Sequence, residues 1–247
     1  MSLVNEFEKQ GNFLFRYRGQ FPVLLFLLAV PFLYWTDAAS LSDCSKDIYC
    51  YSAVILSVFG FFIRAFTVGT TPKGTSGRNT KEQKAFMLNT TGIYSTVRHP
   101  LYLGNYFMWI GIVVFTYNSY FIVIVSLLYW IYYERIMYAE ERFLEQKFGE
   151  EYVTWASGLP VFLPNLKLYK PSIIPFSLKT VLRREYSGVL ATVIGFVFVE
   201  VIRYYFNVGE WFISLSFLYM LLVVSVAALL LRTLKHYTAL LSEEGRS

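Results

Sequence analysis

Long apolar stretches alternate with shorter polar ones along most of the chain. Six of them approach the roughly twenty apolar residues that a membrane-spanning helix needs: 20–36, 50–68, 101–117, 119–138, 187–206 and 209–232. The third and fourth are separated by a few residues only, as are the last two, so each pair predicts an antiparallel hairpin. This pattern predicts an all-α, polytopic membrane bundle of about six transmembrane helices. The first stretch is the weakest candidate because it is short and contains Pro22 and Pro31.

The composition agrees with a membrane protein. Hydrophobic residues make up 55% of the 247 residues and charged residues only 16%, whereas about a quarter of an ordinary soluble domain is charged. The net charge of +5 does not call for a nucleic acid partner, because Lys and Arg at the ends of membrane helices explain it.

The basic residues predict how the helices are oriented. If the N-terminus is cytosolic, all but two of the 22 Lys and Arg residues fall on the cytosolic side, the exceptions being Lys46 and Arg203. Cytosolic loops of membrane proteins carry this excess of positive charge. We therefore expect both termini in the cytosol, with two long polar stretches, 69–99 and 135–186, on the same face.

Four residues outside those stretches raise smaller questions. Cys44 and Cys50 fall in the first outer loop, where a disulfide is permitted; we favour the bridge slightly over two free thiols. Two cysteines and two distant histidines lack the ligand spacing of a metal site, so none is predicted. Glu200 and Arg203 are three residues apart on one helix, and we expect them to pair.

The stretch Ser95–Asn105, "STVRHPLYLGN", places charge at the mouth of an apolar helix. Pro100 suits a first helical turn, where its missing N–H has no consequence. The start of a helix attracts anions, and Arg98 and His99 directly before it strengthen that attraction. Gly104, one turn later, lets a ligand or a neighbouring helix approach the backbone.

An acidic helix is expected to face this stretch. The helical pattern of 119–138 continues beyond the membrane until Gly149, a helix-ending residue. Glu134 and Glu141 share one face of it, and Glu140 lies beside them. Acidic groups opposite Arg98 would suit a zwitterionic nucleoside. The alternative is that Arg and His are interfacial anchors and that the Glu residues are solvated or paired with neighbouring Arg or Lys.

Two blocks resemble a known family. "VRHPLYLGN" is similar to the Arg-His-Pro-x-Tyr-x-Gly motif of the integral-membrane methyltransferases typified by isoprenylcysteine carboxyl methyltransferase, which are related to phospholipid methyltransferases. "EERFLEQKFGEEYVTWASGLPVF" resembles the Glu-Glu, Phe-Gly-x-x-Tyr and Gly-Leu-Pro elements of the same family. The resemblance covers about residues 86–165, with both blocks in the family's order.

The resemblance implies an S-adenosylmethionine-dependent methyltransferase with its active site at the cytosolic face. Residues 1–68 would then be a transmembrane helix pair, 69–186 the methyltransferase core and 187–247 a transmembrane hairpin with a tail. Arg98 would hold an anionic group, while Glu134 or Glu141 would deprotonate an amine acceptor. The expected cofactor-binding residues are His99, Pro100, Tyr102, Leu103, Gly104, Glu140, Glu141, Tyr152, Leu159 and Pro160.

The acceptor and the enzyme class are less tightly constrained. Relatives often carry a basic residue after the Tyr of the second block; here none follows Tyr152, so Arg183 or Arg184 would have to supply that charge. The carboxylate of an isoprenylcysteine-like lipid, entering from the bilayer, is the favoured acceptor; a phospholipid amine and a lipid phosphate remain alternatives. So do an NADPH-dependent sterol or isoprenoid reductase, which resembles the first block, and a non-catalytic membrane scaffold.

Overall fold

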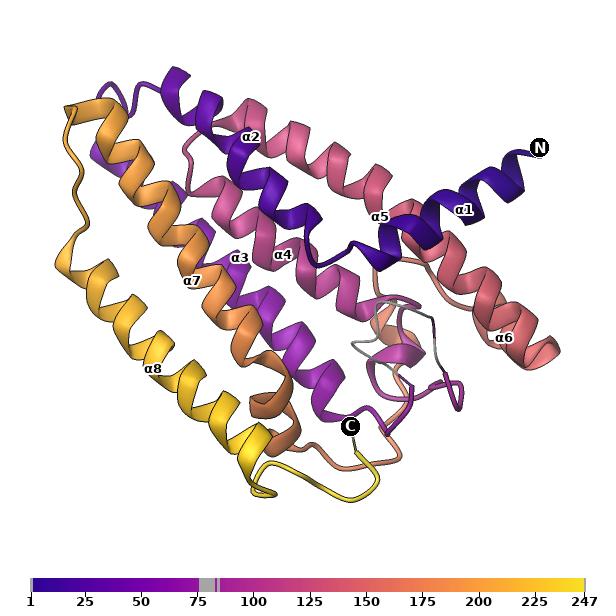
Figure 1. Ribbon diagram of the computed structural model, residues 1–247. Helices are drawn as coiled ribbons and strands as arrows, with labels where there is room; N and C mark the ends of the chain where they lie inside the picture. Colours follow the sequence, from indigo (N-terminus) through magenta and orange to yellow (C-terminus); the bar gives the residue numbers. More distant parts are fainter. Residues whose placement is uncertain (1, 76–82, 84, 247) are drawn as a thin grey trace.

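The protein is a bundle of α-helices (Figure 1). The computed structural model describes residues 2–75, 83 and 85–246. Its α-helices are α1 (Leu3–Arg16), α2 (Phe21–Trp35), α3 (Asp43–Gly69), α4 (Pro100–Val114), α5 (Ser119–Phe148), α6 (Glu150–Ser157), α7 (Leu178–Val208) and α8 (Leu215–Tyr237). Strand-like pairing in these ranges is limited to one isolated bridge, Gly92 to Lys170. The all-α fold class is thereby confirmed.

Each of the six apolar stretches forms a helix, but the helices differ in length. Four of them, α3, α5, α7 and α8, are long and apolar enough to cross a membrane. The other two, α2 and α4, have 15 residues each. Such a helix is about 22 Å long, which is less than the roughly 30 Å of a bilayer's hydrocarbon core. The chain is thus a membrane protein with four candidate spans, and six full spans stay a prediction.

Small residues bring α3 and α4 unusually close together. A Cβ atom added at Gly60 would lie 2.5 Å from the Gly104 carbonyl oxygen, and one added at Gly111 would lie 2.1 Å from Ser57 Oγ. The Ser57 hydroxyl donates a hydrogen bond to the Met108 carbonyl oxygen at 3.1 Å. Within lipid the hydrophobic effect does not drive helices together, so helix pairs depend on close van der Waals packing, which small residues at the interface allow. The contact holds the first turns of α4 in place against α3.

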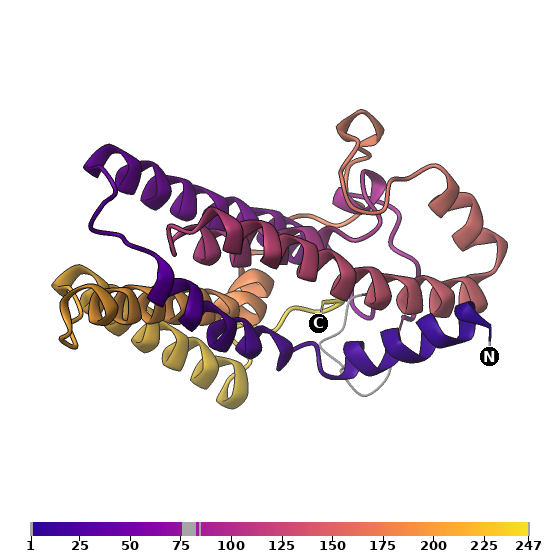
Figure 2. The same ribbon diagram turned by 90° about the horizontal axis from the view of Figure 1, so that it is seen from above.

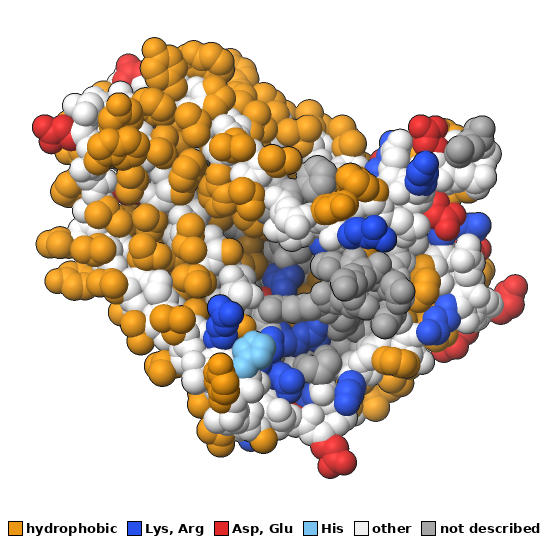
Figure 3. All heavy atoms as spheres, in the orientation of Figure 1, with side chains coloured by type: hydrophobic (Ala, Val, Ile, Leu, Met, Phe, Trp, Pro, Cys, Tyr) orange, Lys and Arg blue, Asp and Glu red, His pale blue; other side chains and the backbone are white. Residues whose placement is uncertain are grey.

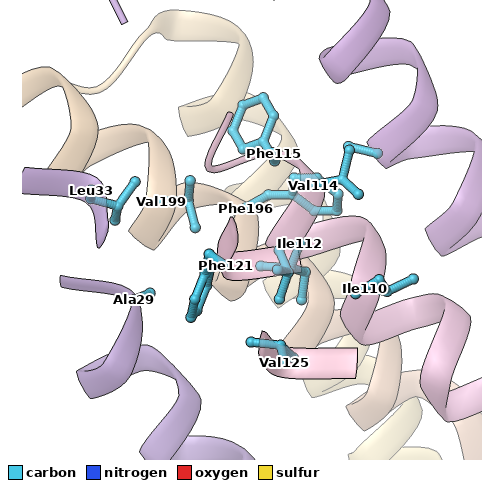
Figure 4. Packing of buried hydrophobic residues seen from close by; sticks show 12 residues of the cluster. Ala29, Leu33, Ile110, Ile112, Val114, Phe115, Phe121, Val125, Phe196 and Val199 are labelled. Atoms are coloured by element: carbon cyan, nitrogen blue, oxygen red, sulfur yellow. The ribbon is translucent and has the colours of Figure 1, made fainter. Parts of the chain in front are cut away.

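A hydrophobic core joins the remaining central helices (Figure 4). Leu33 of α2, Phe121 of α5 and Val199 of α7 are almost fully buried in one cluster. Phe32 stacks on Phe121 with ring centroids 4.7 Å apart. Interlocked packing of this density fixes the positions of α2, α5 and α7 relative to one another.

The two ends of the bundle differ in character. The loops 36–42 and 209–214 lie at one end, while α1, α6 and the long segments around residues 85–99 and 158–177 lie at the other (Figures 1 and 2). Figure 3 shows hydrophobic side chains over the flank formed by α7 and α8 and Lys and Arg gathered toward the second end. Both polar stretches that the sequence placed on one face therefore meet at one end of the bundle.

Residues 3–16 form the amphipathic helix α1, which packs on α5 through Gly11 and Phe15 and for which the hydrophobic pattern gave no prediction. The structure corrects two expectations. Helix α7 begins at Leu178, nine residues before the predicted stretch. The preference for a disulfide is wrong: Cys44 and Cys50 are free. They lie on one helix, about 9 Å apart along its axis, beyond disulfide reach.

Candidate functional site

Helix α4 begins where the sequence predicts, with Pro100 in its first turn. The segment before it is held by the chain that follows α6. The Arg98 backbone N–H donates to the Pro160 carbonyl oxygen at 3.0 Å, and the Asn165 N–H donates to the Thr96 carbonyl oxygen at 2.9 Å. These bonds join the first sequence block to the second, so the two blocks form one unit at the end of the bundle.

Four charged or ionisable side chains of the two blocks interlock. Arg98 Nη1 donates to Glu141 Oε2 at 2.8 Å, and His99 Nε2 lies 2.9 Å from Glu141 Oε1. The other ring nitrogen of His99, Nδ1, lies 3.6 Å from Glu140 Oε2. The expected meeting of the α4 start with the acidic face of α5 is confirmed by these contacts.

The surroundings of His99 favour its protonated form. Burial lowers the pKa of this imidazole, but its hydrogen bonds to the carboxylates of Glu140 and Glu141, together with their negative charges, outweigh the burial and raise the pKa above its ordinary value. A protonated His99 donates from both ring nitrogens and holds the two carboxylates apart. The cluster therefore has fixed geometry and alternating charge.

A cavity of about 330 Å³ lies against this cluster, within the size range of small-molecule sites. Arg98, His99, Pro100 and Tyr102 line it from the first block, and Glu140 and Tyr152 from the second. Further walls come from α1, the turn after it, α3 and α7, through Phe15, Arg18, Arg64, Arg184 and Glu185. Residues from six helices and both polar stretches thus surround one space.

Aromatic rings form part of the wall. The Tyr102 ring stacks against His99 with centroids 5.7 Å apart and meets Tyr133 at 4.8 Å. The Tyr129 hydroxyl donates to the Tyr102 carbonyl oxygen at 2.6 Å, which fixes the backbone of the first turn of α4. A flat heterocycle can stack on such a wall.

Three buried polar atoms of cavity-lining residues have no hydrogen-bond partner among the described residues: Arg98 Nε, Tyr152 Oη and Gln83 Oε1. The Gln83 oxygen is an acceptor, whereas Arg98 Nε and Tyr152 Oη donate hydrogen bonds, and a buried donor without a partner is costly. A carboxylate in the cavity would satisfy the two donors, while Glu140 would accept bonds from an ammonium group or from hydroxyls. The residues present therefore fit the zwitterionic nucleoside S-adenosylmethionine.

Other expected site residues lie behind the wall or away from it. Leu103 is buried, and Gly104 faces α3, where an added Cβ atom would lie 2.5 Å from Arg64 Cγ. Leu159 precedes the Pro160 carbonyl that holds Arg98, and it bonds back to Ala156. Glu134 is half-exposed and pairs with its neighbour Arg135 at 3.1 Å, as the alternative reading of this residue predicted.

One part of the cavity was not predicted. Arg64 of α3, Asn105 of α4 and Glu185 of α7 line it, and Arg64 bonds to both of the others. A charged residue inside an apolar helix is a signal of function by itself, and Arg64 met that criterion in the sequence. Glu185 lay just outside the predicted limits of its helix, so it did not. In the described part of the chain no group of three or more His, Cys, Asp or Glu residues could hold a metal ion.

Comparison with known proteins supports the resemblance. Residues 49–151 match the model of the family described as phospholipid methyltransferase. The chain is 29% identical over 111 residues to protein-S-isoprenylcysteine O-methyltransferase of Saccharomyces cerevisiae, covering 44% of this chain and 46% of the relative. The same enzyme of Mus musculus is 29% identical over 138 residues, covering 55% and 46%.

A third relative carries a different name. The cobalt-zinc-cadmium resistance protein CzcN of Cupriavidus metallidurans is 34% identical over 83 residues, covering 34% of this chain and 38% of the relative. The alignments span less than half the length of these curated relatives. No solved structure matches the chain. The shared segment contains α4, α5 and the charged cluster between them.

Proposed function

We propose that this protein is a membrane methyltransferase that moves a methyl group from S-adenosylmethionine to a lipid or lipidated acceptor. The observation that carries the proposal is the cluster in which Arg98 and His99 share the carboxylate of Glu141 beside the cavity. Both halves of this cluster lie in the segment that matches the methyltransferase family. The relatives' names give the reaction class.

Different side chains would bind different parts of the cofactor. Tyr152 Oη and Arg98 Nε would donate to the cofactor's carboxylate, and Glu140 would accept from its ammonium group or ribose. Tyr102 and His99 offer the stacking surface, while Glu141 keeps both Arg98 and His99 in position. The bound cofactor supplies an electrophilic methyl carbon, and the protein supplies alignment and electrostatics.

The favoured acceptor is the carboxylate of an isoprenylcysteine-like lipid, entering from the bilayer at the cytosolic face. A carboxylate is already nucleophilic, so no general base is needed, and Glu134, outside the cavity, needs no role. Of the two candidate anchoring arginines, Arg184 is buried and lines the cavity, whereas Arg183 bonds to Ser242 at an exposed position. We therefore assign the extra positive charge to Arg184.

The first test is which cofactor stabilises the purified full-length protein against thermal unfolding. S-adenosylhomocysteine should raise the melting temperature, while NADPH should leave it unchanged. Stabilisation by NADPH alone would instead support a reductase, and no stabilisation by either compound would support a scaffold. Each result selects one of the three functions.

The second test examines the charged cluster. Glu141→Gln removes the charge shared by Arg98 and His99 and should weaken S-adenosylhomocysteine binding by about 10- to 100-fold, since a hydrogen bond to a charged group is worth about 1.5–3 kcal/mol. The matched control is Glu145→Gln, one turn further along α5, whose carboxylate pairs with Arg142 at a partly exposed position. Equal affinity of the two variants would remove Glu141 from the site.

The third test identifies the acceptor. The protein is incubated with S-adenosylmethionine and an isoprenylcysteine, a phospholipid amine or an isoprenyl phosphate, and each product is weighed by mass spectrometry. A methyl gain on the isoprenylcysteine carboxylate supports the favoured acceptor. A gain on one of the other two assigns the acceptor to that class instead.

A further inference from the structure

A second charged cluster lies inside the bundle, where α3, α4 and α7 meet. Arg64 of α3 makes a two-pronged ion pair with Glu185 of α7: Nε to Oε2 and Nη2 to Oε1, both at 2.7 Å. Arg64 Nη1 also donates to Asn105 Oδ1 of α4 at 2.6 Å. The side chain of Glu185 is only 3% exposed and that of Arg64 17%. The ion pair is therefore largely buried.

Stability alone does not account for this pair. Removing two charges from water costs as much as, or more than, their attraction returns, so apolar replacements of similar size are often equally stable. The cost is greater within a membrane helix, where ionisable groups mark functional sites by default. All three members also line the cavity, so the pair is positioned to meet whatever enters it.

The cluster and the charged motif face the same cavity at different depths. Asn105 lies six residues after His99, which corresponds to about 9 Å along α4 toward the apolar part of the bundle. His99 and Arg98 thus line the outer part of the cavity, and Arg64 lines the part nearer the apolar centre of the bundle. One cavity contains two separate polar subsites.

Arg64 is also held so that it can donate further hydrogen bonds. Its guanidinium has five N–H groups, and the bonds to Glu185 and Asn105 use three of them. The motif residue Gly104 makes room for it, because a Cβ atom there would lie 2.5 Å from Arg64 Cγ. Buried Arg184 adds a second positive charge to the same cavity wall.

We propose that Arg64, oriented by Glu185 and Asn105, binds the anionic group of the lipid acceptor at the membrane end of the cavity. The inference rests on the proposed methyltransferase function and adds the residues that select the acceptor. A planar guanidinium pairs with a carboxylate or a phosphate through two parallel hydrogen bonds. The lipid chain would then extend between the apolar helices.

The test compares acidic and neutral probes on the full-length protein saturated with S-adenosylhomocysteine. The probes are N-acetyl-S-farnesylcysteine, its carboxamide and farnesyl phosphate, which share one apolar chain. The double variant with Arg64→Gln and Glu185→Gln removes both charges, so no buried charge is left without its partner. Its matched control is Glu200→Gln with Arg203→Gln, which removes an ion pair of 2.6 Å at the other end of α7.

The wild type and the control should bind the acid about 10- to 100-fold more tightly than the carboxamide, the range expected for hydrogen bonds to a charged group. In the Arg64/Glu185 variant that preference should fall to about one, with carboxamide affinity unchanged. A preference for farnesyl phosphate that is lost in the same way supports the same anchor with a phosphate acceptor. An acid preference that survives in the variant overturns the inference.

Two further measurements separate the possible failures. Arg64→Lys keeps a charge beside Glu185 but lacks the planar fork, so it should retain part of the acid preference even if the double variant does not fold; full retention counts against the anchor. S-adenosylhomocysteine binding to the wild type is measured first. Its absence contradicts the proposed function, whereas normal binding with an unchanged acid preference contradicts only the role of Arg64.

Discussion

The two ends of α7 each carry an Arg–Glu ion pair, and the pairs differ in almost every other respect. Glu200 and Arg203 lie three residues apart on one helix, 2.6 Å from each other. Arg203 also donates to the Phe115 carbonyl oxygen and lies over the Tyr117 ring. Glu185 instead pairs across helices with Arg64, 121 residues away, and faces a cavity.

The difference teaches how to tell a structural pair from a functional one. The pair at the far end is enclosed by the protein, because Arg203 joins α7 to the end of α4 through the Phe115 carbonyl and lies over two aromatic rings, and neither of its members lines the cavity. The pair at the cavity end joins three helices and retains N–H groups beside an enclosed space. Both pairs have short distances and low side-chain exposure, although only Glu185 is fully buried; the neighbouring cavity distinguishes the two pairs.

The largest expected difference between the two pairs is in their contribution to the free energy of unfolding. Glu185→Ala leaves the Arg64 charge buried without its main partner and should lower the free energy of unfolding by about 3–5 kcal/mol. Glu200→Ala leaves Arg203 with its carbonyl and ring contacts and should cost about 0.5–1 kcal/mol, as for partly exposed pairs. Denaturation of both variants in the same detergent measures the two losses. Equal losses would show that the two pairs have the same structural role.

The sequence predicted the pair at the far end and missed the one at the cavity end for a simple physical reason. Residues three apart on a helix are neighbours whatever the fold, so Glu200 and Arg203 could be joined without a structure. The Arg64–Glu185 contact depends on how α3 and α7 pack, and no local pattern encodes that packing. Helix α1 was missed because its apolar positions are interrupted by charge and its partner, α5, is far away in the chain.

The predicted site shows the same limit. Both sequence blocks were identified, and the structure places Arg98 and His99 against Glu140 and Glu141, since each block lies at an end of a helix that its own residues define. Gly104 was read as a close approach of a ligand or a helix, and the structure shows a helix with the Arg64 stem. Which of two neighbours fills the space is decided by tertiary packing.

Helix α1 packs only at the cavity end of the bundle, so a substitution in it tests that end alone. Its expected effect on stability is smaller than that of Glu185→Ala. An added Cβ atom at Gly11 would lie 2.1 Å from the Arg135 carbonyl oxygen on α5. Overpacking of this kind costs about 1–3 kcal/mol, which exceeds the gain of up to about 1 kcal/mol in helix propensity. Gly11→Ala should therefore destabilise the protein by about 1–2 kcal/mol.

Phe15, one turn after Gly11, lines the cavity, so Gly11→Ala should also weaken S-adenosylhomocysteine binding, measured by calorimetry. The control is Gly19→Ala, where nothing lies within 4 Å of an added Cβ atom. If both variants unfold at the wild-type temperature and bind normally, α1 is not part of the cavity wall in solution.

The smallest expected effect is a pH dependence that belongs to the cavity end alone. His99 faces Glu140, Glu141 and Tyr102, and its pKa in the folded protein is raised. Its contribution to stability is therefore complete below the ordinary histidine pKa of about 6.5 and is lost as the pH rises through the higher folded value. The melting temperature should fall over this interval, and His99→Gln should flatten the fall. The chain's other histidine, His236, is exposed, so the His236→Gln variant should show the wild-type dependence of melting temperature on pH. If His236→Gln flattens the fall and His99→Gln does not, the titrating group lies outside the cluster.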